Sequence, residues 1–186
     1  IVVVGGGLTA VDTCTEALAY YPVQVEKFLA RFERLCAQDG EAAVRQGWTP
    51  AEAEVAAEFI AHARALRAER AAAGREGREA RIAQLLQGWG GARIVYRRKL
   101  AAAPAYRNHI EIEKALEEGI WFGEEMTPVA VDVDGWGHAA ALRVVRGSEE
   151  IVLPARSILI AAGTVPNTIV AREQPGYALD GKYFQA

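Results

Sequence analysis

The chain has 186 residues, of which 51% are hydrophobic and 24% are charged, and its formal net charge is −3 at pH 7. This is enough apolar material for a sizeable core in one domain or somewhat more. The slightly negative charge argues against nucleic acid as the main partner, and no apolar run approaches the length of a membrane span.

The start of the chain predicts a strand, a glycine turn and a helix. Residues 1–4 are apolar and β-branched, which favours a buried strand. Gly5-x-Gly7-x-x-Ala10 then has the spacing of the dinucleotide fingerprint, in which the first glycine makes the turn, the second lets a pyrophosphate approach and the small third residue packs on the strand. The first N–H groups of the following helix would hold the phosphates. An ordinary glycine-rich turn between a strand and a helix is the alternative.

The helix after this turn has apolar residues spaced to face a sheet, namely Leu8, Val11, Cys14 and Leu18. Pro22 predicts that this helix ends or kinks near residues 20–22. Residues 23–38 are helical by their spacing, and Thr49-Pro50-Ala51-Glu52 is a capping box that starts another helix. Residues 71–79 predict an exposed helix end and a turn around Gly74 and Gly77, and residues 82–89 carry a last helical stripe. We therefore predict an all-helical insertion at residues 22–91.

The strand pattern returns at residue 92. We expect a strand at 92–98, a loop at 101–104, a helix at 106–118 that Gly119 ends, and a strand at 120–122. Residues 128–134 and 138–145 alternate around a glycine turn and predict an antiparallel hairpin, with a short strand at 150–153. Residues 157–163 predict a buried strand, followed by a turn at 164–167 and a tail without a strong period. The expected fold class is α/β with a β-hairpin layer.

Two cysteines, Cys14 and Cys36, stand alone, which is typical of packing roles in a reducing compartment, so we expect a cytoplasmic protein. There is no C-x-x-C pair and no metal-ligand cluster, and we interpret His62, His109 and His138 as structural or solvated. The chain starts inside a strand and stops without a clear end of an element, so we expect a piece of a longer protein.

Four segments together resemble the NADPH-binding domain of the flavin-dependent pyridine nucleotide-disulfide oxidoreductases, in the branch typified by the glutamate synthase small subunit. They are similar to that branch's motifs in the expected order: Gly5-Gly-Gly-Leu-Thr-Ala-Val-Asp12, Val95-Tyr-Arg-Arg98, Glu111-x-x-x-Ala115-x-Glu117-Glu-Gly119 and Ile158-Leu-Ile-Ala-Ala-Gly-Thr-Val-Pro-Asn167. The resemblance implies a Rossmann-like domain at residues 1–21 and 92–167, with residues 168–186 starting the return to an FAD domain outside this chain.

The resemblance also implies the cofactor-binding residues, which are Gly5, Gly6, Gly7, Leu8, Thr9, Ala10, Asp12, Arg97, Arg98, Ala162 and Gly163. Arginine at the end of the second strand suits the 2′-phosphate of NADPH, where an NAD site has an acidic residue. Arg97 and Arg98 could instead be surface arginines, and Asp12 could be a carboxylate favoured by the helix dipole. Ala162 and Gly163 could simply pack tightly at a crossover.

Some features depart from the family pattern. The helical insertion is absent from it, the family's Met-Pro before the third helix stands as Ala103-Pro104, and the FAD fingerprint is missing. We therefore expect FAD in the full-length parent but not in this chain, which should be colourless and inactive as an NADPH oxidase when isolated.

The resemblance implies an enzyme, an NADPH-dependent flavin oxidoreductase. This chain would deliver hydride from NADPH to FAD, and the electrons would pass to a further acceptor such as an iron–sulfur or other redox partner subunit. No catalytic acid, base, nucleophile or metal ligand is assigned. The alternative is a protein-interaction module on a nucleotide-binding fold, in which the helical insertion docks a partner subunit.

Overall fold

The computed structural model describes residues 1–163, 167–181 and 183–185, the side chain of His109 excepted. The chain is mixed α/β, and its central element is a parallel sheet with strand order β3-β2-β1-β7. Its strands are β1 (Val2–Val4), β2 (Arg93–Val95), β3 (Trp121–Gly123) and β7 (Ile158–Ile160). Val3 aligns with Ile94 on one side and with Leu159 on the other, so β1 is an inner strand.

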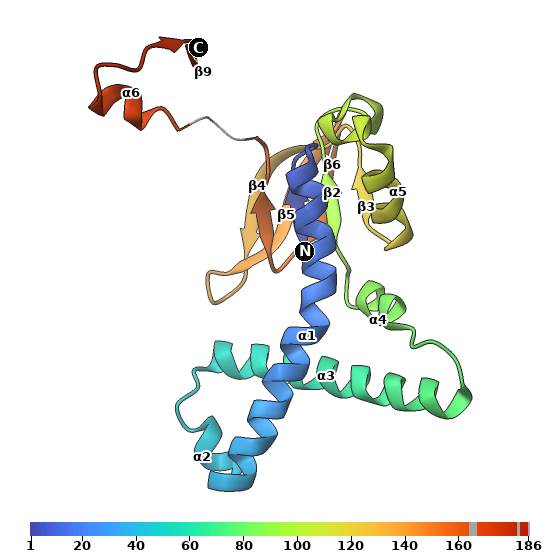
Figure 1. Cartoon of the computed structure of the whole chain (residues 1–186). Coiled ribbons are helices and arrows are strands. Elements are labelled where there is room, and N and C mark those ends of the chain that lie inside the picture. The colour runs from blue at the N-terminus through green and yellow to red at the C-terminus, as the bar shows by residue number, and fades with distance from the viewer. Residues whose placement is uncertain (164–166, 182, 186) are drawn as a thin grey trace.

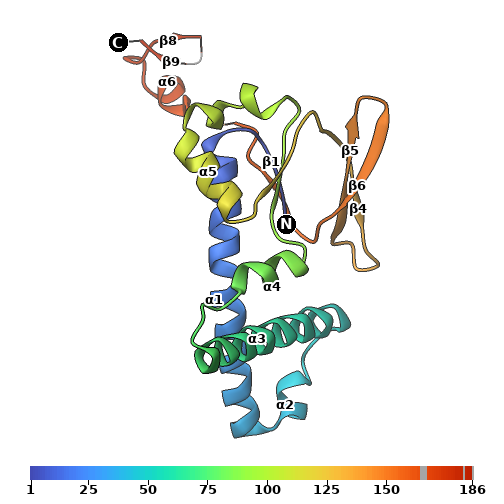
Figure 2. The same cartoon turned by 90° about the vertical axis from the view of Figure 1, so that its right-hand side faces the viewer.

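Helices cover one face of this sheet (Figure 2). They are the first half of α1 (Leu8–Asp39) and α5 (His109–Glu117). Val11, Cys14 and Leu18 of α1 are buried there as expected, but Leu8 is 41% exposed and does not face the sheet. The helix predicted from residue 106 begins later, because two short 3-10 helices precede it, Leu100–Ala102 (η1) and Pro104–Arg107 (η2).

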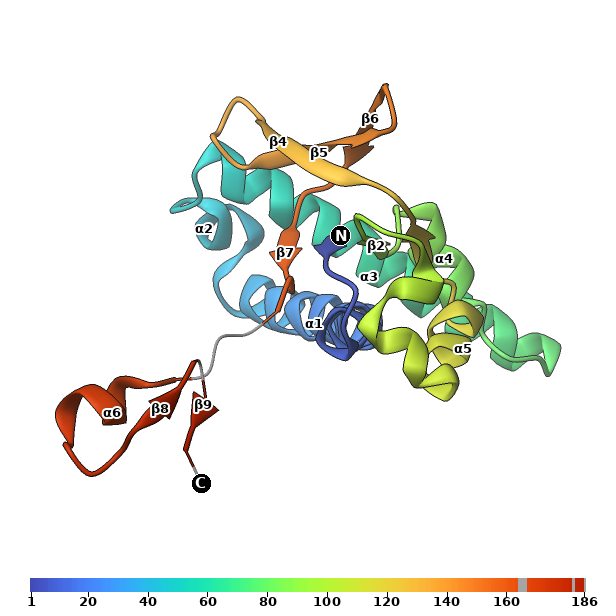
Figure 3. The same cartoon turned by 90° about the horizontal axis from the view of Figure 1, so that it is seen from above.

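A three-stranded antiparallel sheet covers the other face (Figure 3). It contains β4 (Thr127–Val133), β5 (Ala139–Arg146) and β6 (Glu149–Pro154), which confirms the predicted hairpin and the strand after it. The apolar cluster between the two sheets includes Val2, Val95, Leu142 and Val144. The body therefore has three layers: helices, parallel sheet and antiparallel sheet.

Helix α1 does not end at Pro22, so one of the two outcomes expected there, an end or a kink, is wrong. It continues to Asp39 with Pro22 buried inside it. A proline in a helix interior costs about 3 kcal/mol. The second half of α1 offsets this cost by burying Val25, Leu29 and Phe32 in one cluster with α3 (Pro50–Glu76). The boundary predicted at residue 22 thus falls in the middle of a continuous helix.

Residues 22–91 are otherwise helical as predicted (Figure 1). Besides α1 and α3 they form α2 (Glu41–Arg45) and α4 (Ile82–Gly88). The capping box at the start of α3 is confirmed, since the Thr49 hydroxyl accepts from the Glu52 N–H and the Glu52 carboxylate accepts from the Thr49 N–H at 2.8 Å. Helix α3 ends at Gly77 with φ +64°, so Gly74 lies inside the helix and not in the expected turn.

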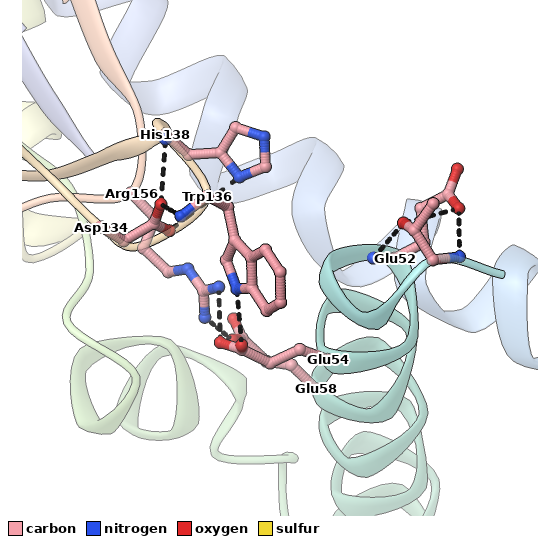
Figure 4. A network of polar contacts seen from close by, with 8 residues as sticks. Glu52, Glu54, Glu58, Asp134, Trp136, His138 and Arg156 are labelled. Carbon is pink, nitrogen blue, oxygen red and sulfur yellow. Dashed lines mark hydrogen bonds and ion pairs between the residues drawn. The ribbon is translucent and has the colours of Figure 1, made fainter.

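A polar network joins the helical segment to the antiparallel sheet (Figure 4). Arg156, between β6 and β7, pairs with Glu58 at 2.6 Å and Glu54 at 3.1 Å on α3. The Trp136 indole N–H donates to the Glu54 carboxylate at 3.4 Å. Asp134 holds the turn that carries Trp136 by accepting from the N–H groups of Trp136 and His138.

Strand β7 is less buried than the sequence predicts. Leu159 is 39% exposed and Ile160 is 73% exposed, because β7 forms the edge of the parallel sheet. Of the turn predicted at 164–167, residues 164–166 lie outside the described residues. The tail contains three short elements, α6 (Ile169–Glu173), β8 (Leu179–Asp180) and β9 (Tyr183–Phe184).

Among the described residues, no helix combines the length and the apolar character needed to cross a membrane.

Candidate functional site

The candidate site lies at the carboxyl end of β1, where the strand order reverses. From β1 the chain goes to β2 and β3 on one side, whereas β7 pairs on the other side. In open α/β sheets, ligands bind in the crevice at such a switch point. Because the strands are parallel, the residues after β1, β2 and β7 meet at one edge of the sheet.

Each glycine of the turn has a different environment. A Cβ on Gly5 would strike the Ala161 carbonyl group, and one on Gly6 would strike the ring of Tyr96. A Cβ on Gly7 would meet no atom of the described residues within 4 Å. The surrounding chain therefore excludes a side chain at the first two positions but leaves open space beside Gly7.

The turn is held by backbone hydrogen bonds to the neighbouring strands and to the loop after β2. The Gly5 N–H donates to the Val95 carbonyl at 3.0 Å, and the Gly6 carbonyl accepts from the Ala105 N–H at 2.9 Å. Ala10 is fully buried against the turn, as its predicted packing role requires. The sequence reasoning missed Tyr96 and Ala105 as supports of the turn; an aromatic residue directly after a buried strand is the signal that indicates Tyr96.

Free N–H groups gather at the start of α1. Gly7 is the N-cap residue and provides no side-chain cap. Within the described residues, no hydrogen bond engages the N–H groups of Gly6, Gly7, Leu8 or Thr9. Such groups, together with the positive end of the helix dipole, attract anions.

Asp12 is exposed on α1, beyond its first turn, which contains no acidic residue. The helix dipole acts mainly within the first turn, so it gives little reason for a carboxylate at this position. Thr9 is also exposed, and its carbonyl accepts from the Thr13 hydroxyl at 2.5 Å.

Arg97 and Arg98 lie in the loop after β2 and not on the strand, because β2 ends at Val95. Tyr96 bonds to the next segment instead, through its N–H to the Gly123 carbonyl at 2.9 Å and its carbonyl to the Met126 N–H at 3.0 Å. Both arginines are exposed, and neither side chain forms an ion pair or hydrogen bond within the described residues. Strand alternation, which turns consecutive side chains to opposite faces, therefore does not apply to these two arginines.

Ala162 and Gly163 follow β7 at the same edge of the sheet. Both are exposed, and a Cβ on Gly163, whose φ is +117°, would meet no atom of the described residues within 4 Å. Within the part of the chain that the structure describes, this exposure argues against the alternative that they only fill a tight crossover.

The other candidate groups are distant from this edge or inert. Burial raises the pKa of the Cys14 thiol to about 12, so the thiol stays protonated at neutral pH. His62 is structural, since its Nδ1 lies 2.6 Å from the Tyr21 hydroxyl and its ring stacks on Trp89 at 3.8 Å. No set of three metal-ligating side chains occurs within the part of the chain that the structure describes.

No protein-family model matches the chain. It is similar to the uncharacterized protein RP006 of Rickettsia prowazekii (strain Madrid E), with 33% identity over 143 residues. The match covers 76% of this chain and 18% of that protein, so the chain spans less than a fifth of its relative's length. The name of this relative gives no activity, so a function for this chain can be proposed only from the site itself.

Proposed function

We propose that this chain is the Rossmann-like NADPH-binding part of a flavin-dependent oxidoreductase. It would hold NADPH across the switch point and present the nicotinamide to FAD bound by another part of a longer protein. The electrons would then pass to a further acceptor, such as an iron–sulfur centre or a partner subunit. Hydride transfer is the chemistry of the two cofactors, and the residues of this chain bind and orient NADPH.

The observation that carries the proposal is the combination of free N–H groups and open space at Gly7. A pyrophosphate there would accept hydrogen bonds from the N–H groups of residues 6–9 at the start of α1. Only a residue without a side chain leaves that approach open.

The proposed choice of NADPH over NADH depends on Arg97 and Arg98. They follow β2, which neighbours β1, and this is where the adenosine ribose lies in dinucleotide sites. Two guanidinium groups without a carboxylate partner suit the 2′-phosphate, which accepts charge-assisted hydrogen bonds.

Thermal unfolding of the chain with and without nucleotide tests the proposal. A ligand at 100 times its dissociation constant stabilises the native state by about 2.7 kcal/mol. At about 2–4 °C per kcal/mol for a chain of this size, NADPH should raise Tm by roughly 5–10 °C. NADH at the same concentration should raise it less. Equal shifts, or no shift with NADPH up to millimolar concentration, would contradict the proposal.

The alternative function, a protein-interaction module, has one observation in its favour. A hollow of about 550 Å³ lies between α1 and α2, with Phe28, Phe32, Leu35 and Trp48 in its wall. Leu35 is 42% exposed there. The same melt separates the two functions, because docking of a partner subunit predicts no protection by NADPH.

A further inference from the structure

A second hollow lies between the two sheets, at the opposite end from the glycine turn. Its volume is about 520 Å³, within the range of small-molecule sites. It opens beside the amino ends of β2 and β3, whereas the candidate nucleotide site lies at their carboxyl ends. The residues that line it are Gln87, Gly90, Ala92, Arg93, Trp121, Met126, Arg146, Ile151 and Leu153.

One wall comes from the parallel sheet. Arg93 of β2 aligns with Trp121 of β3 in the parallel register. Gly123, two residues after Trp121, lies against the Trp121 ring and the sulfur of Met126. Since strand residues two apart share a face, Trp121 and Arg93 point towards the antiparallel sheet.

The floor of the hollow is apolar. Met126 and Leu153 are only 2% and 6% exposed and belong to the core between the sheets. Ile151 packs against the same core. Trp121 also lines the hollow and is 42% exposed, so part of this aromatic residue is accessible beside the floor.

The polar side of the hollow is positively charged. Arg93 and Arg146 line it, and none of the described residues contributes a carboxylate to the lining. Among the described residues neither arginine forms an ion pair, although Arg78, Arg143 and Arg156 each pair with two acidic residues. The Arg146 Nε donates to the Glu124 carbonyl at 3.2 Å, which anchors that side chain. Its terminal N–H groups form no hydrogen bond to the residues that the structure describes.

We propose that this hollow is a second ligand site, and that it binds a small organic anion with a flat aromatic body, such as an aryl carboxylate, sulfonate or phosphate. The aromatic body would lie on Trp121 over Met126 and Leu153. Its anionic group would accept hydrogen bonds from Arg93 and Arg146. The site is separate from the proposed NADPH site and does not depend on it.

The test uses two fluorescent probes with the 186-residue chain. Anilinonaphthalene sulfonate is an aromatic anion, and phenylnaphthylamine is its neutral counterpart. Fluorescence titration gives the dissociation constant and the stoichiometry of each. We expect one sulfonate probe per chain, bound more tightly than the neutral probe.

Arg93→Gln and Arg146→Gln should each raise the dissociation constant of the sulfonate probe about 10-fold, because each removes a charge-assisted hydrogen bond. Neither substitution should change the dissociation constant of the neutral probe. Arg146 is exposed, so its variant keeps the test valid even if Arg93→Gln fails to fold. Trp121→Ala should lower the affinity for both probes, because it removes the aromatic surface on which both would lie.

Arg31→Gln is the matched control, since Arg31 lines the hollow between α1 and α2. It should leave both dissociation constants unchanged. The proposal is overturned if Arg31→Gln lowers the affinity for the sulfonate probe, or if Arg93→Gln and Arg146→Gln both bind that probe as tightly as wild type. It is also overturned if Arg93→Gln and Arg146→Gln lower the affinities for the two probes equally.

Discussion

At the scale of single residues, the three consecutive glycines have three different explanations. The carbonyl of Ala161 excludes a side chain at Gly5, and the ring of Tyr96 excludes one at Gly6. At Gly7 no neighbouring atom does so, and its backbone is extended with φ −92°. A glycine that its own fold does not require is consistent with a ligand that approaches it.

Alanine at two of these positions separates folding from binding. Gly5→Ala should destabilise the chain by about 1–3 kcal/mol, because its Cβ overlaps a backbone carbonyl that no side-chain rotation can move away. Gly7→Ala, the matched control, should change stability by no more than about 1 kcal/mol. It should nevertheless lower the affinity for NADPH by about 10-fold or more, since its side chain hinders at least one hydrogen bond to a phosphate.

Thermal melts and nucleotide titrations of both variants provide the measurement. Equal loss of stability in Gly5→Ala and Gly7→Ala would show that the fold itself requires a glycine at position 7. Unchanged NADPH affinity in Gly7→Ala would place the pyrophosphate elsewhere.

At the scale of elements, α1 connects two apolar clusters that share no residue. Its first half contributes Val11, Cys14 and Leu18 to the cluster beneath the parallel sheet. Its second half contributes Val25, Leu29 and Phe32 to the cluster with α3. The helical segment therefore has its own core and touches the sheets through α4 and the contacts of Arg156 and Trp136.

Because the cores are separate, replacing residues 24–90 with a short glycine-rich linker should leave a folded α/β body. The deletion removes every buried residue of the cluster around Leu29 and Leu66, and the residues of the other two clusters remain, apart from the partly buried Leu86. The entropy of closing a loop grows slowly with its length, so the linker adds little cost. The measurement is a thermal melt followed by circular dichroism. A variant that is never soluble, or that melts without cooperativity, would show that the helical segment is part of the core.

At the scale of the whole molecule, the sequence predicted what local interactions determine. The capping box of Thr49 and Glu52 is correct because both partners lie within three residues of each other. The strand, glycine turn and helix at the start are correct for the same reason, since each is encoded by adjacent residues.

Two predictions failed because they depend on distant contacts. Whether α1 continues past Pro22 depends on Ile60 and Leu66, which lie on another helix. The exposure of Ile160 depends on where β7 stands in the sheet. In the candidate site, the sequence predicts the order in which the segments follow one another. It does not predict that the Tyr96 ring lies against Gly6, because that contact depends on how the loop after β2 folds.

The most direct test of the central claim is the dissociation constant of NADPH and of NADH for wild type, Arg97→Ala and Arg98→Ala. A hydrogen bond to a charged group is worth about 1.5–3 kcal/mol, so loss of an arginine that contacts the 2′-phosphate should weaken NADPH by roughly 10- to 150-fold. NADH has a neutral hydroxyl at that position, so its affinity should change little. We predict that wild type binds NADPH more tightly than NADH, and that the ratio of the two dissociation constants becomes smaller in at least one variant. Wild type that prefers NADH, or variants that lose both nucleotides equally, would contradict the account.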